Sequence, residues 1–263
     1  MSEWQTLAVE SDGGVTEIRL NRPELLNRFD MDLHRELTRL FHDLAVDPAV
    51  LAVVLSSTGR VFSAGGDIKV MLEAAGDLGH RMAMIDEGRL LFRAVADFPK
   101  PLIVALTGNS YGLGTSIILL GDAIVTTAEI EFSDPHVHMG LVAGDGGTTA
   151  WPLAMGMIRA KRHLLTGDAL SGKEAYRLGV VTDLVNTDEE IVPAARALAA
   201  RIAKLPPVAV QMTKRALAKA AMSRADEVMD LSFYLEALSF GSDDLREAIA
   251  AFKEKREGVF KGR

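Results

Sequence analysis

The sequence contains no cysteine, no long apolar run and fewer basic than acidic residues. Without cysteine the chain cannot form a disulfide, a thiolate nucleophile or a zinc site with cysteine ligands. Its apolar runs fall short of the ~20 residues that span a bilayer, and no basic-then-apolar leader opens the sequence. These absences predict a protein that does not cross a membrane and that acts in the cytoplasm.

The charge balance argues against a nucleic-acid partner. Lys and Arg number 29 against 36 Asp and Glu, which gives a formal net charge of −7. Binding to a phosphate backbone depends on clustered basic side chains that release counterions. The short basic runs at 253–256 and 261–263 are local exceptions. At 263 residues the chain is long enough to bury a substantial core in one large α/β body.

Hydrophobic periodicity predicts an α/β body over residues 1–188 and a purely helical region over residues 189–263. The expected strands are Leu7–Glu10, Val15–Leu20, Val50–Ser56, Leu102–Leu106, Ala123–Thr127 and Val180–Val185. The expected helices are Met31–Val46 with Asp30 as its cap, Leu78–Phe98, Thr115–Leu120, Ala150–Leu165, Ser171–Leu178, Ile191–Leu205, Val208–Ala221, Arg224–Phe240 and Ser242–Arg256. The first two strands flank Asp12-Gly13-Gly14, a sequence typical of a β-hairpin turn.

Two glycine-rich turns follow expected strands and lead into helices. The first is Phe62-Ser-Ala-Gly-Gly-Asp-Ile-Lys69, and the second is Gly108-Asn-Ser-Tyr-Gly-Leu-Gly114. Glycine lets the backbone approach a ligand and leaves amide N–H groups available to it. Free amides at such a turn favour a developing anion, so both turns are candidate binding sites for a polarised oxygen. A simple strand-to-helix turn is the alternative interpretation.

A third loop, Ile130–Thr148, contains two groups that can exchange protons near neutral pH. His136 follows Ser133-Asp134-Pro135, which ends a short apolar strand, and Asp145 lies within a glycine cluster nine residues later. The glycines free the backbone to bring the two side chains together. We interpret this loop as the floor of an active site, against the alternative of a polar surface turn with an incidental histidine.

Together, these motifs resemble the crotonase, or enoyl-CoA hydratase/isomerase, superfamily across essentially the whole chain. The motifs that carry the resemblance are Leu20–Pro23, Phe62–Lys69, Gly108–Gly114, Gly167–Ala175 and Phe252–Arg256. The resemblance implies an α/β fold, a spiral of ββα units with a C-terminal helical trimerisation region. It also implies a homotrimer or a dimer of trimers.

The same resemblance implies an acyl-CoA substrate whose thioester oxygen is held by two backbone amides, an oxyanion hole. By position these amides belong to Ala64 and Leu113. Coenzyme A enters as part of the substrate, with no separate cofactor and no metal. The residues that the resemblance assigns to its binding are Ala64, Gly65, Gly66, Asp67, Ile68, Lys69, Phe252 and Lys255. One fixed donor to an enolate oxygen is worth about 3 to 4 kcal/mol.

Two departures from the family pattern bear on the chemistry. Hydratases of the family deliver water with two glutamates, and the corresponding positions here are Ser116 and His136. The loop is more similar to that of the β-diketone hydrolases of the superfamily, in which a histidine backed by an aspartate activates water. That similarity covers His136 and Asp145 and adds a late glutamate at Glu236, whereas a further histidine of that pattern is replaced by Leu113.

Three functional hypotheses follow. The first is an enzyme that acts on an acyl-CoA thioester through an enolate, with His136 as base and Asp145 as its orienting partner in place of the usual glutamates. The second is a carbon-carbon bond hydrolase of a small cyclic β-diketone. The third is a homologue of low activity that binds acyl-CoA. A metal bound by His136, His138 and Asp145 is a further, weaker alternative because the sequence has no other ligand cluster.

Overall fold

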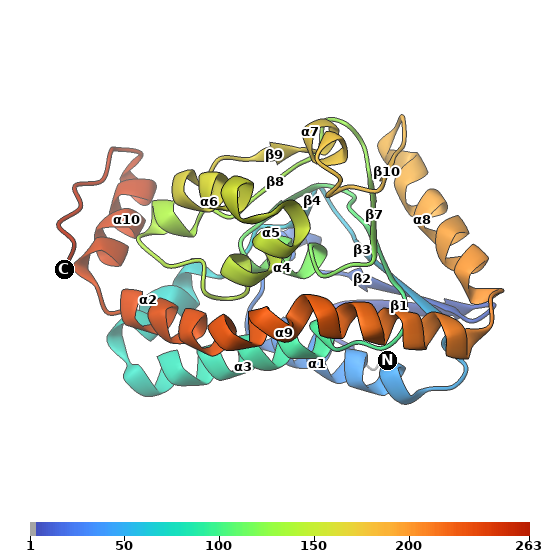
Figure 1. Ribbon diagram of the computed structural model, residues 1–263. Helices are drawn as coiled ribbons and strands as arrows, with labels where there is room; N and C mark the ends of the chain where they lie inside the picture. Colours follow the sequence, from blue (N-terminus) through green and yellow to red (C-terminus); the bar gives the residue numbers. More distant parts are fainter. Residues whose placement is uncertain (1–3) are drawn as a thin grey trace.

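A six-stranded sheet lies beside α8, on the right of the molecule as drawn in Figure 1. The computed structural model describes residues 4–263, with the backbone alone at 224–226. In spatial order the strands are β1 (Leu7–Asp12), β2 (Val15–Leu20), β3 (Ala52–Ser57), β5 (Leu102–Ala105), β7 (Ala123–Thr126) and β10 (Asp183–Leu184). β1 and β2 form the predicted antiparallel hairpin, and every later pairing in this sheet is parallel.

Helices cover both faces of this sheet, as continuous apolar strands such as β3 and β5 require. α8 (Asp188–Ala203) packs on β3, β5 and β7, whereas α1 (Met31–Val46) and α3 (Leu78–Ala96) lie on the other side (Figure 1). Asp30 caps α1 as predicted, because its side chain accepts a hydrogen bond from the amide of Leu33. The boundary proposed at residues 188 and 189 therefore lies at the start of a helix that belongs to the core.

A second sheet runs beside the first and has the order β4, β6, β8, β9. Its strands are β4 (Val61–Ser63), β6 (Asn109–Tyr111), β8 (Glu131–Ser133) and β9 (Leu170–Ser171). The chain alternates between the sheets, since β3, β5 and β7 of the first are each followed directly by β4, β6 and β8 of the second. Helices follow each of these pairs, which gives the predicted spiral of ββα units.

The helices after the second-sheet strands are mostly short. They are α2 (Ile68–Gly76), α4 (Leu113–Ile118), α5 (Gly147–Met155), α6 (Met157–Thr166) and α7 (Gly172–Arg177), with 3-10 turns at Pro23–Leu25 (η1) and His136–Met139 (η2). The single helix expected over Ala150–Leu165 is wrong. Gly156, with φ of 81°, separates α5 from α6 because an ordinary side chain rarely adopts that conformation.

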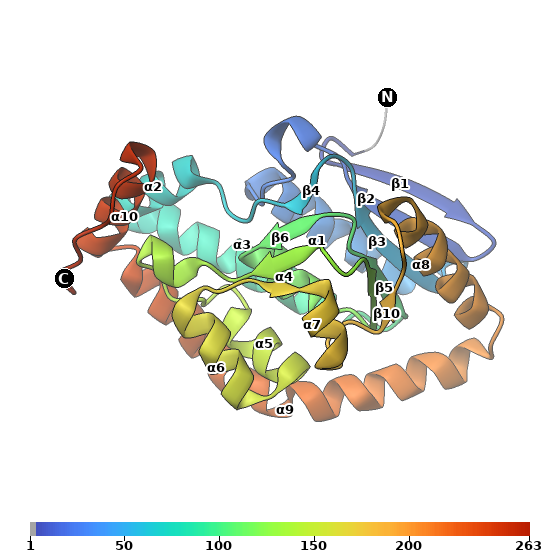
Figure 2. The same cartoon turned by 90° about the horizontal axis from the view of Figure 1, so that it is seen from above.

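The C-terminal region is helical, and in the described chain the last strand ends at Leu184. α9 (Pro207–Ser239) is one continuous helix where two were expected, and α10 (Asp243–Glu254) follows it. In both views α9 spans the molecule from the side of α8 to the side of α10 (Figures 1 and 2). Among the described residues, no helix has both the length and the apolar character required to cross a bilayer.

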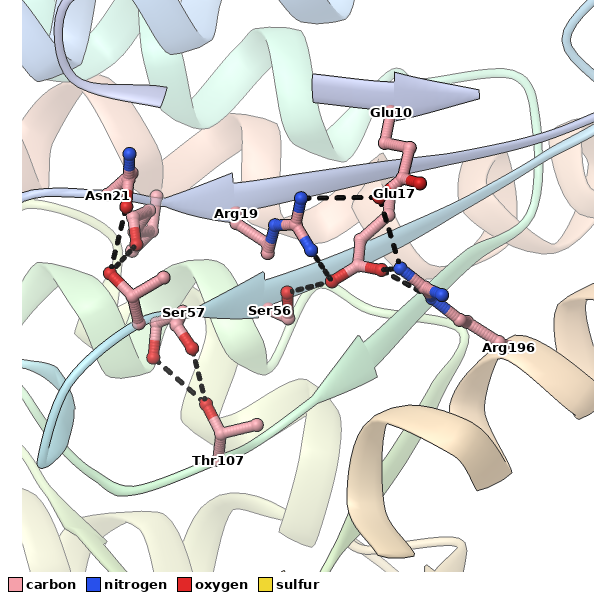
Figure 3. Close-up of polar contacts among 10 residues, drawn as sticks. Glu10, Glu17, Arg19, Asn21, Ser56, Ser57, Thr107 and Arg196 are labelled. Atoms are coloured by element: carbon pink, nitrogen blue, oxygen red, sulfur yellow. Dashed lines mark hydrogen bonds and ion pairs between the residues drawn. The ribbon is translucent and has the colours of Figure 1, made fainter. Parts of the chain in front are cut away.

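A buried carboxylate joins α8 to the sheet (Figure 3). Glu17 on β2 is 3% exposed and accepts hydrogen bonds from Ser56 Oγ at 2.7 Å and from Arg196 Nε at 2.5 Å. Arg19 lies 3.9 Å away on the same strand. Because a buried charge is costly unless it is paired, these partners fix α8 against β2 and β3.

We expect Arg196→Ala to lower the free energy of unfolding by about 2 kcal/mol, because it removes the α8 partner of the buried Glu17 while Ser56 and Arg19 remain. Urea denaturation at fixed protein concentration measures this. Arg177→Ala, which breaks the exposed pair with Glu174, is the matched control and should change stability by less than about 0.5 kcal/mol. Equal effects of the two variants would contradict the assigned role of Glu17.

Candidate active site

Three loops that carry the predicted site residues meet at one edge of the second sheet. β4, β6 and β8 are parallel neighbours, with Ser63 paired to Ser110 and Tyr111 paired to Ser133. Because parallel strands end at the same edge, the segments that follow them lie together. The turn at 64–67 follows β4, the turn at 112–113 follows β6, and the segment at 134–136 follows β8.

The amide assigned to Ala64 is already used within the protein. Its N–H donates to the carbonyl of Leu26 at 2.9 Å, so the prediction that this amide is a free oxyanion donor is wrong. The next amide, that of Gly65, donates to Ser63 Oγ at 3.1 Å. Gly66 is the first residue of this turn whose N–H has no acceptor among the described residues.

The second amide that the resemblance implies as a donor is that of Leu113. It is the first residue of α4, where a helical N–H has no acceptor within the helix, and no other described residue accepts from it. Gly66 and Leu113 both line the cavity that also contains His136. The sequence does not show that the amide of Ala64 is occupied, because its pairing with Leu26 depends on a distant loop.

The three predicted acid-base side chains come together. His136 is 7% exposed, and its Nε2 lies 3.3 Å from Asp145 Oδ2 and 3.9 Å from Glu236 Oε1. The sequence analysis missed a fourth group, Asp134, whose Oδ1 lies 2.5 Å from His136 Nδ1. Each ring nitrogen therefore faces a carboxylate, and the closest one is two residues before the histidine in the sequence.

Glycine at position 144 allows the C-terminal helix to reach this cluster. A Cβ atom there would lie 2.4 Å from Glu236 Cβ and 2.4 Å from the carbonyl oxygen of Ser232, closer than real Cβ contacts allow. Ser232 Oγ also donates to the carbonyl of Gly144 at 3.1 Å. Glu236, 4% exposed, is thereby held inside the protein rather than on a solvated helix face.

Burial and mutual charge shift two of these pKa values. Burial lowers the pKa of His136, but the charges of Asp145 and Asp134 and hydrogen bonds to both outweigh it, so this pKa lies well above its ordinary value of 6.5. Burial and the charge of Asp145 raise the pKa of Glu236 well above 4.5. The protonated forms of His136 and Glu236 are therefore both favoured beside the two aspartates.

Asp134, His136 and Asp145 also form a group of metal-ligand type, with ligand atoms within 4.8 Å of one another. The two aspartates contact opposite nitrogens of one imidazole ring, however, and a single ion cannot bind both nitrogens of that ring. We interpret the group as an acid-base cluster. The expectation of an enzyme without a metal stays a prediction.

Two connected spaces adjoin the cluster. A small cavity of about 50 Å³ has a mostly apolar lining, and an open groove of about 700 Å³ leads outward. Gly66, Asp67, Met71 and His136 border both of them. The arrangement can take a ligand with a small group in the cavity and a large group in the groove.

Six of the residues predicted to bind coenzyme A line the groove: Ala64, Gly65, Gly66, Asp67, Ile68 and Phe252. Lys69 and Lys255 are absent from the described residues that line the groove. Lys69 instead lies 3.9 Å from Glu73 with its side chain 83% exposed. The groove also contains a cation that the sequence analysis missed, Arg28, which is paired with Asp67 at 3.2 Å.

Ser116, at the position of one hydratase glutamate, is fully buried in α4. Its Oγ has no hydrogen-bond partner among the described residues. A hydroxyl is a poor acid or base at neutral pH. The groups of the site that can exchange protons are therefore His136 and the carboxyl groups around it.

Comparison with known proteins places this architecture in a family. The profile of the family described as Enoyl-CoA hydratase/isomerase matches residues 10–263. The Short-chain-enoyl-CoA hydratase of Clostridium acetobutylicum is 32% identical over 97% of this chain and 97% of that protein. The 1,2-epoxyphenylacetyl-CoA isomerase of Escherichia coli is 32% identical over 95% of this chain and 96% of its own.

Solved structures agree with this result. The crystal structure of an enoyl-CoA hydratase/isomerase from Mycobacterium paratuberculosis matches with a TM-score of 0.89 and 35% identity, over 95% of this chain and 99% of that chain. The chain therefore belongs to the enoyl-CoA hydratase/isomerase family, within the crotonase superfamily, and is an enzyme of that family. Its resemblance to β-diketone hydrolases stays a prediction.

Replacing Asp134 by Asn should lower the pKa of His136, because it removes one of the two charges that raise it. Since the folded-state pKa of His136 is raised, its stabilising contribution is present in full below pH 6.5 and is lost as pH rises through the folded-state pKa. The variant should lose part of this contribution at low pH. Titration of the His136 ring by NMR, together with denaturation at several pH values, measures both effects.

The exposed pair of Asp168 with Arg162 supplies the control. Asp168→Asn should leave the His136 titration unchanged. A His136 pKa that is the same in Asp134→Asn and in the wild type would show that Asp134 does not stabilise the imidazolium.

Proposed function

We propose that this enzyme transfers a proton at the α-carbon of an acyl-CoA thioester through an enolate. The supporting observation is that the free amides of Gly66 and Leu113 border the same cavity as the His136 cluster. In this proposal the two amides donate to the thioester oxygen, the acyl group occupies the cavity and coenzyme A lies in the groove. Fixed donors stabilise an enolate oxygen more than the ground-state carbonyl.

The proton-transfer step uses His136 and Asp145 as a unit. Asp145 Oδ1 has no partner within the described chain, and Asp145 lines the cavity, so this oxygen is placed to accept the α-proton. The C–H electron pair moves onto the thioester oxygen, and the enolate is then protonated again. The imidazolium of His136 balances the charge of Asp145, while Asp134 fixes the ring by its contact with Nδ1.

Isomerisation is the reaction of this class that the cluster favours. Return of the proton to the γ-carbon moves the double bond with no net gain of atoms. Glu236 lies 3.9 Å from His136, and burial and the charge of Asp145 raise its pKa, which favours its protonated form as a second proton donor on the same side. Hydration by paired glutamates requires a carboxylate at position 116, where a buried serine lies instead. The proposal requires no bound cofactor or metal, since coenzyme A is part of the substrate.

A carbon-carbon bond hydrolase of a cyclic β-diketone is the second candidate. The contact of Asp134 with His136 Nδ1 favours it, because a carboxylate at one ring nitrogen orients the imidazole so that the other nitrogen can act on a water molecule. Water would attack a ketone carbon, and the enolate left by C–C cleavage would take up a proton. The apolar cavity of about 50 Å³ and the large groove favour the CoA ester instead.

We further propose that three copies of the chain assemble, or two such trimers. α9 has one apolar stripe that is buried in its own chain, including Met229 and Phe233. A second stripe is exposed at Val228, Leu231, Tyr234, Leu235 and Leu238. Its spacing places these side chains on one helix face, and such a face is usually covered by a partner. The cytoplasmic location stays a prediction.

The enolate proposal predicts exchange of the α-protons of butanoyl-CoA with deuterium from solvent, which mass spectrometry measures without knowledge of the natural substrate. His136→Asn and Asp145→Asn should each slow this exchange by about 100-fold or more, because general acid-base catalysis typically contributes 10²- to 10⁴-fold. His42→Asn, on the exposed face of α1, is the matched control and should exchange at the wild-type rate.

The outcomes separate the candidates. Exchange that survives in both site variants would contradict the role of the cluster. Tight binding of butanoyl-CoA without exchange would favour a homologue that only binds acyl-CoA. Turnover of a cyclic 1,3-diketone without any binding of acyl-CoA would favour the hydrolase.

The assembly proposal predicts the mass of a trimer or hexamer in light scattering coupled to gel filtration. Leu238→Glu, at a side chain that is 73% exposed in the single chain, should lower the measured mass because it places a charge in the buried contact. Val46→Glu, at an exposed position at the end of α1, is the control and should not change the mass. A monomer in the wild type would exclude the assembly.

A further inference from the structure

A second buried histidine borders the small cavity. His34 on α1 is 5% exposed, and neither ring nitrogen has a hydrogen-bond partner among the described residues. Its ring lies 5.8 Å from that of Phe29, and both residues line the cavity that contains Gly66, Leu113 and His136. No step proposed above uses this side chain.

The described residues around His34 form no hydrogen bond with either of its ring nitrogens. Most cavity residues near the site are apolar: Val70, Met71, Met84, Ile85, Gly88, Phe233 and Phe240. Asp30 also lines the cavity, but Arg22 holds its two carboxylate oxygens at 2.7 Å each, and Asp30 accepts from the amide of Leu33 as well. The carboxylate of Asp30 therefore already has hydrogen-bond partners at the start of α1, and it does not pair with His34.

A buried polar group without a partner costs about 1 to 3 kcal/mol, so it marks a position where a ligand atom is expected. Burial lowers the pKa of His34 to about 4, and the ring is therefore neutral at physiological pH. A neutral imidazole offers one donor and one acceptor. It suits an uncharged hydroxyl or carbonyl group, and it offers no charge to bind a carboxylate.

We propose that His34 determines substrate specificity by hydrogen bonding to an uncharged oxygen on the acyl group, away from the thioester. This inference rests on the proposed function, because the thioester must lie at Gly66 and Leu113 for the acyl group to share the cavity with His34. The cavity of about 50 Å³ admits only a short acyl group. The substrate class is therefore a short oxygenated acyl-CoA, with a hydroxyl or oxo group distal to the carbonyl.

The test compares pairs of saturated acyl-CoA esters that differ only by a terminal methyl or hydroxyl group. Suitable pairs are butanoyl with 3-hydroxypropanoyl, pentanoyl with 4-hydroxybutanoyl, and hexanoyl with 5-hydroxypentanoyl. Isothermal titration calorimetry gives the dissociation constants of both members. For the pair whose oxygen reaches His34, the hydroxyl ester should bind about tenfold more tightly than its methyl partner, as a net hydrogen bond to a buried group provides.

His34→Leu should remove this preference, chiefly by weakening the hydroxyl ester. Met84→Leu changes an apolar wall of the same cavity and should preserve the ratio of the two constants. His34→Gln, which retains a neutral donor and acceptor, should retain part of the preference. The wild-type comparison decides the proposal even where His34→Leu does not fold.

Each outcome has a separate meaning. If no acyl-CoA ester binds, the proposed function fails. If the esters bind but no hydroxyl ester is preferred at any length, acyl-CoA binding stands and the role of His34 is overturned, as would occur if water alone occupied the space beside the ring. A preference that persists in His34→Leu would overturn it as well.

Discussion

The parallel pairing of β4, β6 and β8 is the constraint on which the site depends. Each strand is only three residues long, yet their common direction brings three segments that are distant in sequence to one edge. Phe29 adds a fourth segment, because its amide donates to the carbonyl of Gly65 at 2.8 Å and so ties the start of α1 to the first glycine turn. The free amides, the histidine and the cavity wall are thus positioned by backbone pairing, which side-chain changes alter little.

The acid-base cluster illustrates how the protein tolerates several ionisable groups in one buried place. Four such residues lie within a few ångströms, and the cluster raises the pKa values of His136 and Glu236, which favours the protonated forms of both beside the two aspartates. Asp134 directly follows β8, Asp145 lies in the loop before α5, and Glu236 is on α9. Their protonation states therefore depend on the docking of α9, since burial by that helix contributes to the raised pKa of Glu236.

Sequence patterns predicted the fold well because its signals are local: apolar strand runs, glycine turns and capping residues. The meeting of His136 and Asp145 was predicted from the glycines of their loop, and the addition of Glu236 from the resemblance. Three features escaped the sequence analysis, two of them because they depend on contacts between distant segments. The carbonyl of Leu26 accepts the hydrogen bond of the Ala64 amide, and Nδ1 of His136 faces Asp134. In the sequence, His34 has the pattern of any other residue of an amphipathic helix, and only the structure places it at the cavity. Lys69 and Lys255 were predicted to bind coenzyme A from their motifs, but both are exposed. A motif predicts the position of a residue in the fold but not the direction of its side chain.

α9 connects the interior of the site with the surface of the chain. Its inward face carries Phe233 and Glu236, which border the cavity, and its outward face carries Leu235 and Leu238. A rigid helix moves as a whole, so its two faces cannot shift independently. At Gly144 the inward face of α9 packs so closely on the loop before α5 that there is no room for a Cβ atom. A contact between chains on the outward face would therefore involve the helix that places Glu236 3.9 Å from His136. In this way α9 belongs both to the proposed contact between chains and to the acid-base cluster.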